Sequence, residues 1–158
     1  FKVGGIEQLP YADNTFDLVC SIGVIEYLPS YHKAIVEFYR VLKPGGKLVL
    51  STTSNRSPAH YLKPLVEYGK KIPYIAKKFN TKFRNFSVAL HHIPTFKRDV
   101  LDVGFWFREE VYFFMLLYPR PFNLLFPKLS EKLEKYLDKF TNTALKHLAE
   151  GYIIVGKK

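Results

Sequence analysis

The stretch FDLVCSIGVIEYLPSYHKAIVEFYRVLKPGGKLVLSTT, residues 16–53, determines the fold of this chain. It opens with a nearly continuous apolar run, Phe16 to Ile22, which is typical of a strand covered on both faces in a parallel sheet. The next apolar positions recur at helical spacing, and they are Ala34, Ile35, Phe38, Val41 and Leu42. A second strand is predicted over Lys47 to Thr53. Strand, helix and strand with short connections indicate a right-handed crossover unit.

Residues at the ends of this helix and inside the first strand have specific expected roles. Ser30 precedes the apolar repeat, where a hydroxyl can cap the first helical turn. Pro44-Gly45-Gly46 is expected to end the helix, because proline cannot continue the hydrogen-bond ladder and glycine accepts the angles of a tight turn. Cys20 lies within the apolar strand and is expected to be a core residue. Asp17, at the start of that strand, is expected to have a structural role.

The chain beyond residue 53 divides into an insertion and a further part of the core. Residues 54–94 are rich in Tyr, Phe, Lys and Pro, and they predict a basic aromatic insertion with one or two short helices. A helix is predicted over 95–103 and a strand over 105–114. Ser130 can cap a final long helix, whose apolar face would comprise Leu133, Tyr136, Leu137, Phe140, Ala144, Leu145 and Leu148. Tyr152 to Val155 is predicted as the last strand. The expected segments are therefore a core over 1–53, a substrate cover over 54–94 and a C-terminal part of the core over 95–158.

Composition and charge exclude several classes of protein. The chain is 47% hydrophobic, which is unlike a disordered protein, and its single cysteine excludes an internal disulfide. Its longest apolar stretch, Val111 to Tyr118, is shorter than the roughly 20 residues needed to cross a bilayer. Nearly all of the net charge of +10 comes from residues 56–98. We expect a cytoplasmic protein that could lie at the periphery of an anionic membrane.

Three short motifs follow one another in a fixed order. They are Leu9-Pro10-Tyr11, the segment NTFDLV at 14–19 and the segment RVLKPGG at 40–46. Together they resemble the class I S-adenosylmethionine-dependent methyltransferases of the L-P-[FY], F-D-x-V and R-V-L-K-P-G-G type. The resemblance is close over 3–53 and topological beyond. It implies an α/β fold, namely a partial doubly wound Rossmann-like sheet that retains the last four strands, with the final strand antiparallel beside strand 105–114.

The resemblance also implies an activity and a site. Family members transfer a methyl group from S-adenosylmethionine to an O, N or C nucleophile, and a small or lipid-like acceptor is expected here. Ligands of doubly wound sheets lie at the carboxyl ends of the strands. The implied cofactor-binding residues are Gly5, Ile6, Glu7, Ser21, Ile22 and Gly23. The substrate-binding candidates are Glu26 and Tyr27.

The chain departs from the family pattern at several points. Gly5 occupies the usual position of an acid that contacts the adenine, although the Ile6 N–H or Glu7 could serve there. Tyr27 stands where many relatives have a histidine, and a phenol with a pKa of about 10 is better suited to orienting a substrate than to deprotonating it. The Gly-rich turn and the acid that hold the methionine and ribose have no counterpart. The resemblance therefore indicates a C-terminal portion, expected to be inactive without the missing N-terminal half of the domain.

Three groups of residues keep both a functional and a structural interpretation. His91 and His92 are candidate general bases, or else a surface or partly packed pair, and no acid or cysteine at ligand spacing suggests a metal. Glu26 could bind a substrate amine or hydroxyl, or cap the following turn. The basic segment 56–98 could meet anionic lipid, stack on RNA or simply cover the substrate. No RNA-binding motif is present, so lipid is favoured over nucleic acid. The alternative function is a non-catalytic or membrane- or RNA-binding domain derived from a methyltransferase.

Overall fold

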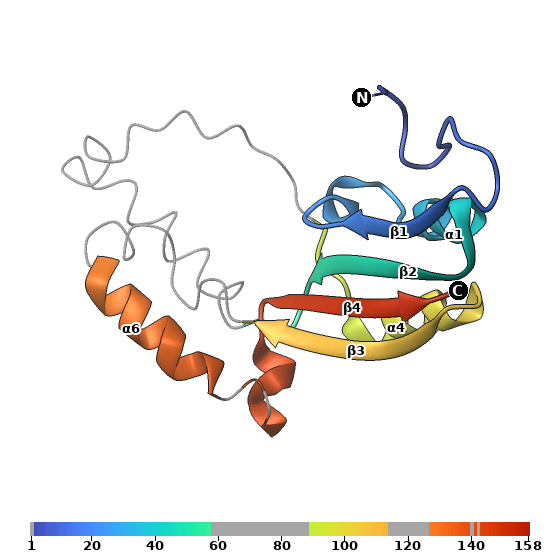
Figure 1. Cartoon of the computed structure of the whole chain (residues 1–158). Coiled ribbons are helices and arrows are strands. Elements are labelled where there is room, and N and C mark those ends of the chain that lie inside the picture. Colours follow the sequence, from blue (N-terminus) through green and yellow to red (C-terminus); the bar gives the residue numbers. More distant parts are fainter. Residues whose placement is uncertain (1, 58–88, 114–126, 140, 142) are drawn as a thin grey trace, which may run out of the picture. The chain divides into compact units, whose positions relative to one another are not determined.

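The computed structural model describes residues 2–57, 89–113, 127–139, 141 and 143–158, and most of the predicted insertion lies outside them. The elements, shown in Figure 1, are β1 (Phe16–Ser21), the 3-10 helix η1 (Ile25–Tyr27), α1 (His32–Val41), β2 (Leu42–Thr53), α4 (Ile93–Asp102), β3 (Trp106–Phe113), α6 (Pro127–Asp138), the 3-10 helix η2 (Ala144–Leu148) and β4 (Gly151–Lys157). The chain forms two compact units, one comprising Phe1–Thr53, Val88–Val111 and Tyr152–Lys158, the other Ser54–Ser87 and Tyr112–Gly151.

The four strands form one sheet in the order β1-β2-β4-β3. β1 and β2 are parallel, with Cys20 opposite Val49 and Ser21 opposite Leu50. The arrows in Figure 1 show that β4 runs opposite to both of its neighbours, β2 and β3. These features confirm the predicted α/β fold and the pairing of an antiparallel last strand with the strand before it.

The core lies between the sheet and the two helices that pack against it, α1 and α4. The predicted apolar face of α1 is buried, as is the alternating set Leu48 and Leu50 of β2. Across this layer the rings of Phe96 and Tyr152 meet edge to face, with their centroids 6.4 Å apart. The buried hydrophobic side chains of the layer include Ala34, Ile35, Phe38, Val41, Leu42, Ile93, Val100, Phe105 and Ile154.

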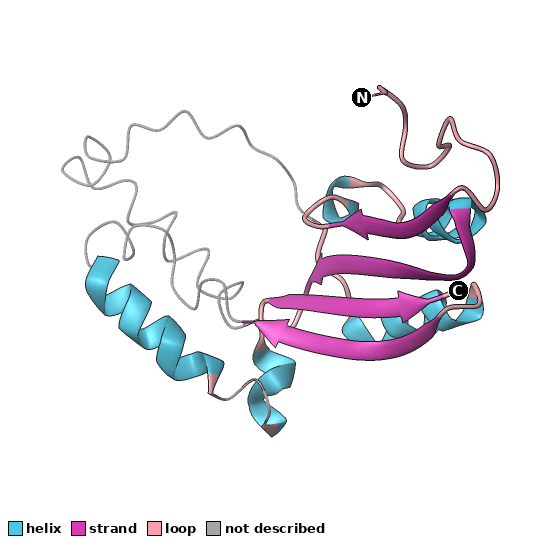
Figure 2. Ribbon diagram, in the orientation of Figure 1, coloured by secondary structure: helices cyan, strands magenta, loops and turns pink. Residues whose placement is uncertain are grey.

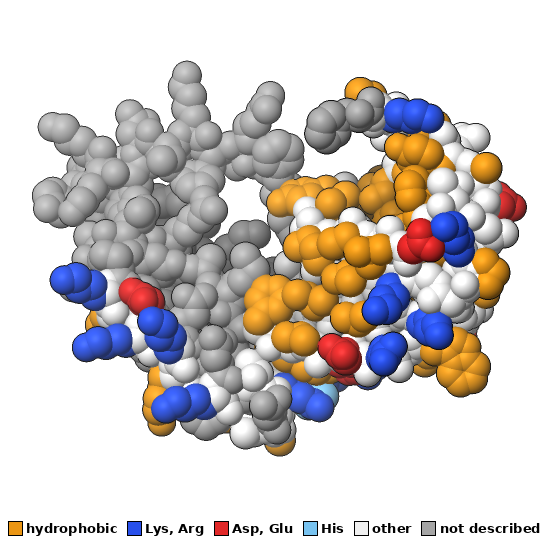
Figure 3. Space-filling view, in the orientation of Figure 1, with side chains coloured by type: hydrophobic (Ala, Val, Ile, Leu, Met, Phe, Trp, Pro, Cys, Tyr) orange, Lys and Arg blue, Asp and Glu red, His pale blue; other side chains and the backbone are white. Residues whose placement is uncertain are grey.

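The opposite face of β1 is open, which contradicts the expectation of a strand covered on both sides. Cys20 is exposed, so its predicted place in the core is wrong, and Leu18 is 55% exposed. Both side chains alternate with Val19 and therefore point away from the face that α1 covers. Figure 3 shows apolar side chains gathered over the strands on the face turned toward the viewer. The apolar run of β1 correctly predicted a strand but not what lies above it.

The boundaries of α1 differ from the predicted ones at both ends. Tyr31, not Ser30, is the residue that precedes the helix, and no side chain caps the first turn. The Tyr31 hydroxyl instead donates a hydrogen bond to Asp99 Oδ2, at 2.5 Å. At the other end, Pro44-Gly45-Gly46 does not stop the helix, because Leu42 is already extended and begins β2.

The two glycines of the third motif serve strand pairing. Gly45, with a φ of +80°, donates its N–H to the carbonyl of Lys158, and Lys158 N–H donates to Gly46 O, both at 2.9 Å. A Cβ on Gly46 would lie 2.9 Å from the Lys43 carbonyl oxygen. Only glycine fits this position without a shift of backbone.

The later elements follow the prediction in order but not in every boundary. The helix predicted over 95–103 is α4, and the strand predicted over 105–114 is β3. The long final helix is replaced by α6 and a separate η2, and Ser130 lies inside α6 rather than at its start. Thr143 accepts a hydrogen bond from Leu145 N–H and so caps η2. No helix within the described part of the chain is long and apolar enough to cross a membrane.

Candidate functional site

The carboxyl ends of β1 and β2 meet at one edge of the sheet because the two strands are parallel (Figure 2). β1 ends at Ser21, and the predicted site loop, residues 21–27, begins there. β2 ends nearby at Thr53. Ligands in doubly wound folds bind at this edge.

The loop after β1 is held close to β2 by a hydrogen bond from its backbone to a serine side chain of β2. Gly23 has a φ of +66°, a conformation that glycine adopts without strain. Its N–H donates to Ser51 Oγ at 2.8 Å. Ser21, the last residue of β1, is buried, and its Oγ has no hydrogen-bond partner among the residues that the structure describes. A buried hydroxyl without a partner is a group that a ligand can satisfy.

Glu26 is the second buried polar group at this edge. It lies in η1 and is 8% exposed, and its Oε2 has no partner within the described ranges. Its backbone carbonyl accepts a hydrogen bond from Ala89 N–H at 2.7 Å, so the loop is fixed to the segment that precedes α4. A buried carboxylate oxygen without a donor is costly, which favours a ligand-binding role over a capping one.

The remaining predicted loop residues, Ile22 and Tyr27, are about half exposed. The Tyr27 N–H donates to Val24 O at 3.0 Å within the turn of η1. Both side chains are therefore partly exposed to solvent at the carboxyl edge of the sheet, unlike the buried Ser21 and Glu26.

His91 and His92 are separated by the structure. His91 is half-buried, its Nδ1 lies 2.6 Å from Thr52 Oγ1, and its ring meets Tyr31 edge-on at 4.8 Å. Burial lowers the pKa of His91. His92 is exposed at the start of α4, with Nδ1 at 3.0 Å from Thr95 Oγ1. Within the described residues no group of three or more His, Cys, Asp or Glu side chains could hold a metal ion.

The predicted adenine-side residues form a small turn. Gln8 N–H donates to Gly5 O at 3.1 Å, which places Ile6 and Glu7 at the tip. A Cβ on Gly5 would meet nothing within 4 Å, so this position faces open space. Glu7 is exposed and has the carboxylate nearest in sequence to the position that Gly5 occupies.

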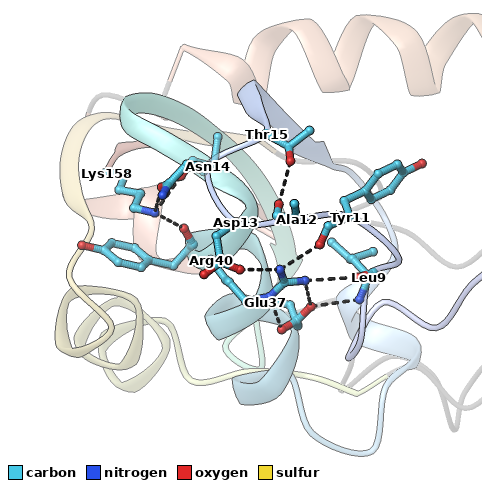
Figure 4. Close-up of polar contacts among 11 residues, drawn as sticks. Leu9, Tyr11, Ala12, Asp13, Asn14, Thr15, Glu37, Arg40 and Lys158 are labelled. Carbon is cyan, nitrogen blue, oxygen red and sulfur yellow. Dashed lines mark hydrogen bonds and ion pairs between the residues drawn. The ribbon is translucent and has the colours of Figure 1, made fainter.

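A polar cluster at the opposite, amino edge of β1 and β2 was not predicted (Figure 4). Arg40 donates to the carbonyls of Leu9 and Tyr11, to Asp13 Oδ1 at 2.7 Å and twice to Glu37. Glu37 Oε2 also accepts the Leu9 N–H at 2.9 Å. We call this arrangement the Arg40 clasp. It links the first motif to the third. The sequence feature that could have indicated this contact is the order in which the two motifs occur.

Further contacts tie the second motif to the same edge. Lys43 pairs with Asp17 at 2.9 Å, in agreement with the structural role predicted for Asp17. Lys158 Nζ donates to Asn14 Oδ1 and to the carbonyls of Tyr39 and Leu42 at the end of α1. A cation at this helix end is favourable because the last carbonyls carry partial negative charge.

Comparison with known proteins finds methyltransferases. A family model described as a methyltransferase domain matches residues 1–50, which hold the three motifs and the loop after β1. The demethylmenaquinone methyltransferase of Bacillus mycoides is 34% identical over 94 residues, covering 59% of this chain and 40% of the relative. The enzyme of the same name from Lactiplantibacillus plantarum is 36% identical over 86 residues, covering 53% of this chain and 36% of the relative.

Solved structures share the fold across the whole chain. A SAM-dependent methyltransferase from Methanosarcina mazei aligns with a TM-score of 0.60 at 19% identity, covering 100% of this chain and 66% of the other. An S-adenosylmethionine-dependent methyltransferase from Mesorhizobium loti gives a TM-score of 0.56 at 14% identity, covering 98% and 67%. At these identities the likeness concerns the fold. The matched part of the chain spans about 40% of the length of its curated relatives.

Proposed function

Because this chain belongs to the class I S-adenosylmethionine-dependent methyltransferases, we propose that the full-length protein transfers a methyl group from S-adenosylmethionine to a small or lipid-like acceptor. The nucleophile of the acceptor is an O, N or C atom. The main support for this proposal is a pair of buried groups without partners among the described residues. They are Ser21 Oγ and Glu26 Oε2, and they lie at the edge where such folds bind ligands. A protein that served only as a scaffold would gain stability from replacing them by apolar groups.

The residues at this edge fit the methionine end of the cofactor. Gly23 has no side chain, so a ligand can approach its backbone closely, and its hydrogen bond to Ser51 Oγ fixes that backbone in place. The Ser21 hydroxyl and the Glu26 carboxylate supply polar contacts, and a carboxylate is complementary to an amino group or to a sulfonium. On the adenine side the turn at Gly5 offers the backbone of Ile6 and the exposed carboxylate of Glu7.

When bound, S-adenosylmethionine supplies an electrophilic methyl group on a positively charged sulfur. The protein's part is to align the acceptor with that methyl and to exclude water, and no covalent intermediate with a side chain is needed. Tyr27, at the rim, orients the acceptor, while Glu26 holds a polar group beneath it.

The acceptor that we propose to test first is a reduced demethylmenaquinone. Two relatives with more than 30% identity are named for that substrate. A quinol with a prenyl tail is a lipid-like molecule, and the net positive charge of 56–98 would bring the protein to the anionic membrane in which such a molecule is dissolved.

The test is calorimetry followed by a methyl-transfer assay on the full-length protein. S-adenosylmethionine should bind, and Glu26→Gln should weaken the binding of cofactor or acceptor by about tenfold, since one charged contact is lost. Glu131→Gln, which changes an exposed carboxylate on α6, is the matched control and should bind normally. Absence of S-adenosylmethionine binding by the full-length protein would overturn the proposed function.

A further inference from the structure

The His91 ring is held on three sides. Its Nδ1 is in hydrogen-bond contact with Thr52 Oγ1, and its backbone N–H donates to Thr53 O at 2.9 Å. The Tyr31 ring packs edge-on against it, and the Phe96 ring stacks at a centroid distance of 6.1 Å. No hydrogen bond involves Nε2 among the residues that the structure describes. The ring is thus oriented, with one nitrogen uncommitted.

This ring lies at the same edge as the loop after β1. Thr52 is the last residue but one of β2, so its hydroxyl marks the carboxyl end of the strand. Ala89 N–H donates to Glu26 O, and Thr53 Oγ1 donates to Ala89 O at 3.0 Å. These contacts bind the segment that carries His91 both to β2 and to the buried Glu26.

The surroundings of His91 keep it neutral. Burial lowers its pKa, so that at neutral pH the imidazole is free to accept a proton. Tyr31, whose ring packs on His91, has a pKa raised chiefly by burial, and its hydroxyl donates to Asp99 on α4. α4 also carries Arg98, whose charge acts on Tyr31, together with Asp102 and with Lys97, which pairs with Glu110 of β3.

We propose that His91 is the general base of the methyl transfer, accepting at Nε2 the proton that the acceptor loses, while Thr52 fixes the tautomer. This inference rests on the proposed function. In the proposed tautomer Nδ1 carries the ring proton and donates it to Thr52 Oγ1, 2.6 Å away, which leaves the lone pair of Nε2 for the acceptor. As the acceptor nucleophile bonds to the methyl carbon, the C–S bond breaks and its electron pair neutralises the sulfonium. The acceptor proton passes to His91, which becomes an imidazolium and later releases the proton to water.

The test measures kcat of the full-length protein with a short-tailed demethylmenaquinol as acceptor. His91→Gln should lower kcat by about 100-fold or more while the dissociation constant of S-adenosylmethionine stays unchanged. The wild-type kcat should fall as the pH drops below the pKa of His91, and the variant should lose that inflection. His32→Gln, at the exposed start of α1, is the matched control and should retain the wild-type rate and pH profile.

Thr52 and the ring nitrogens provide a readout apart from activity. Nitrogen NMR of the wild-type protein should find the neutral His91 ring protonated at Nδ1. Thr52→Ser should preserve this tautomer and most of kcat, whereas Thr52→Val should lose both. Protonation at Nε2 in the wild type would overturn the assignment, even if His91→Gln failed to fold.

The role of His91 and the proposed methyl transfer are tested by different results. Methylation at an undiminished rate by folded His91→Gln would refute the role of His91 and leave the proposed function standing. A loss of kcat in His92→Gln but not in His91→Gln would do the same. Failure of the wild-type protein to bind S-adenosylmethionine would instead remove the proposed function and this inference together.

Discussion

The two edges of the β1–β2 pair differ in whether their polar groups have hydrogen-bond partners within the protein. At the amino edge, the Arg40 guanidinium makes five hydrogen bonds, to two backbone carbonyls and two carboxylates. At the carboxyl edge, Ser21 Oγ and Glu26 Oε2 are buried without partners among the described residues. One edge has satisfied its polar groups internally, and the other leaves groups for something else to satisfy.

On the proposed function, this difference separates the structural part of the family signature from the ligand-binding residues. The three motifs by which the family is recognised meet at the amino edge, where they hold the loop at 9–15 against the end of α1. The candidate ligand-binding residues follow the second motif and lie at the other edge. Substitutions at the amino edge should therefore change stability, and those at the carboxyl edge should change binding.

The largest expected effect is at Gly46. In Gly46→Ala the new Cβ would lie 2.9 Å from the Lys43 carbonyl and 3.0 Å from Leu42 Cδ2, so the backbone must shift. We expect a loss of about 1–3 kcal/mol in the free energy of unfolding, measured by urea denaturation. Gly5→Ala, whose Cβ meets nothing within 4 Å, is the control and should stay within about 0.5 kcal/mol of wild type.

Removal of the Arg40 clasp should come next. Arg40→Met keeps the aliphatic stem but removes the guanidinium that donates to Glu37 and to the Leu9 and Tyr11 carbonyls, so Tm should fall by about 5 °C. Lys135→Met, which breaks an exposed pair on α6, should change Tm little. A stable Arg40→Met protein that had lost S-adenosylmethionine binding would reverse the proposed roles of the two edges.

A smaller and opposite pattern is expected at Ser21. Ser21→Ala removes a buried hydroxyl without a partner, so Tm should stay the same or rise, while the dissociation constant of S-adenosylmethionine should increase about tenfold. Thr15→Val is the counterpart at the amino edge, because the Thr15 hydroxyl donates to Ala12 O at 2.6 Å. It should lower Tm slightly and leave the dissociation constant unchanged. Equal effects of both variants on binding would contradict the proposal that only the carboxyl edge binds the ligand.

The smallest expected effect is a pH dependence of stability from Glu37. Its hydrogen bond from Arg40 lowers the pKa of this carboxyl below its usual 4.5. The unfolded chain therefore binds the proton more readily, and this stabilisation is present above about pH 4.5 and is lost as the pH falls through the lowered value. Urea midpoints measured against pH should show a shallower acid slope for Glu37→Gln. An unchanged slope would mean that the pair contributes nothing.

Local patterns in the sequence predicted most elements of the fold. Apolar spacing and the family resemblance predicted the order of strands and helices, the buried face of α1 and the antiparallel last strand. Both can be recognised in the sequence alone. The exposure of Cys20 was missed because burial depends on what covers a strand, which the strand's own residues do not encode. Ser30 was preferred as the cap by residue type, yet the tertiary bond from Tyr31 to Asp99 accompanies a helix start one residue later.

The candidate site was predicted only in outline. The sequence offered the loop at 21–27 and the histidine pair as candidates, and they remain predictions, but it could not distinguish His91 from His92. That distinction comes from Thr52, which lies 39 positions away and provides the hydrogen bond to the ring. The Arg40 clasp was likewise not predicted from the sequence, because it joins a loop to a helix nearly 30 residues further along the chain.

The contacts of Lys158 affect the order in which parts of the sheet can form during synthesis. This residue bonds to Asn14, 144 positions earlier in the chain, and its strand β4 lies between β2 and β3 in the sheet. The Arg40 clasp needs only residues 9–40, but the contacts of Lys158 and the pairing of β4 between β2 and β3 cannot form until these later residues have left the ribosome. The nascent chain therefore holds β1 and β2 with an unpaired β2 edge until β4 emerges, a state prone to aggregation and to binding by chaperones.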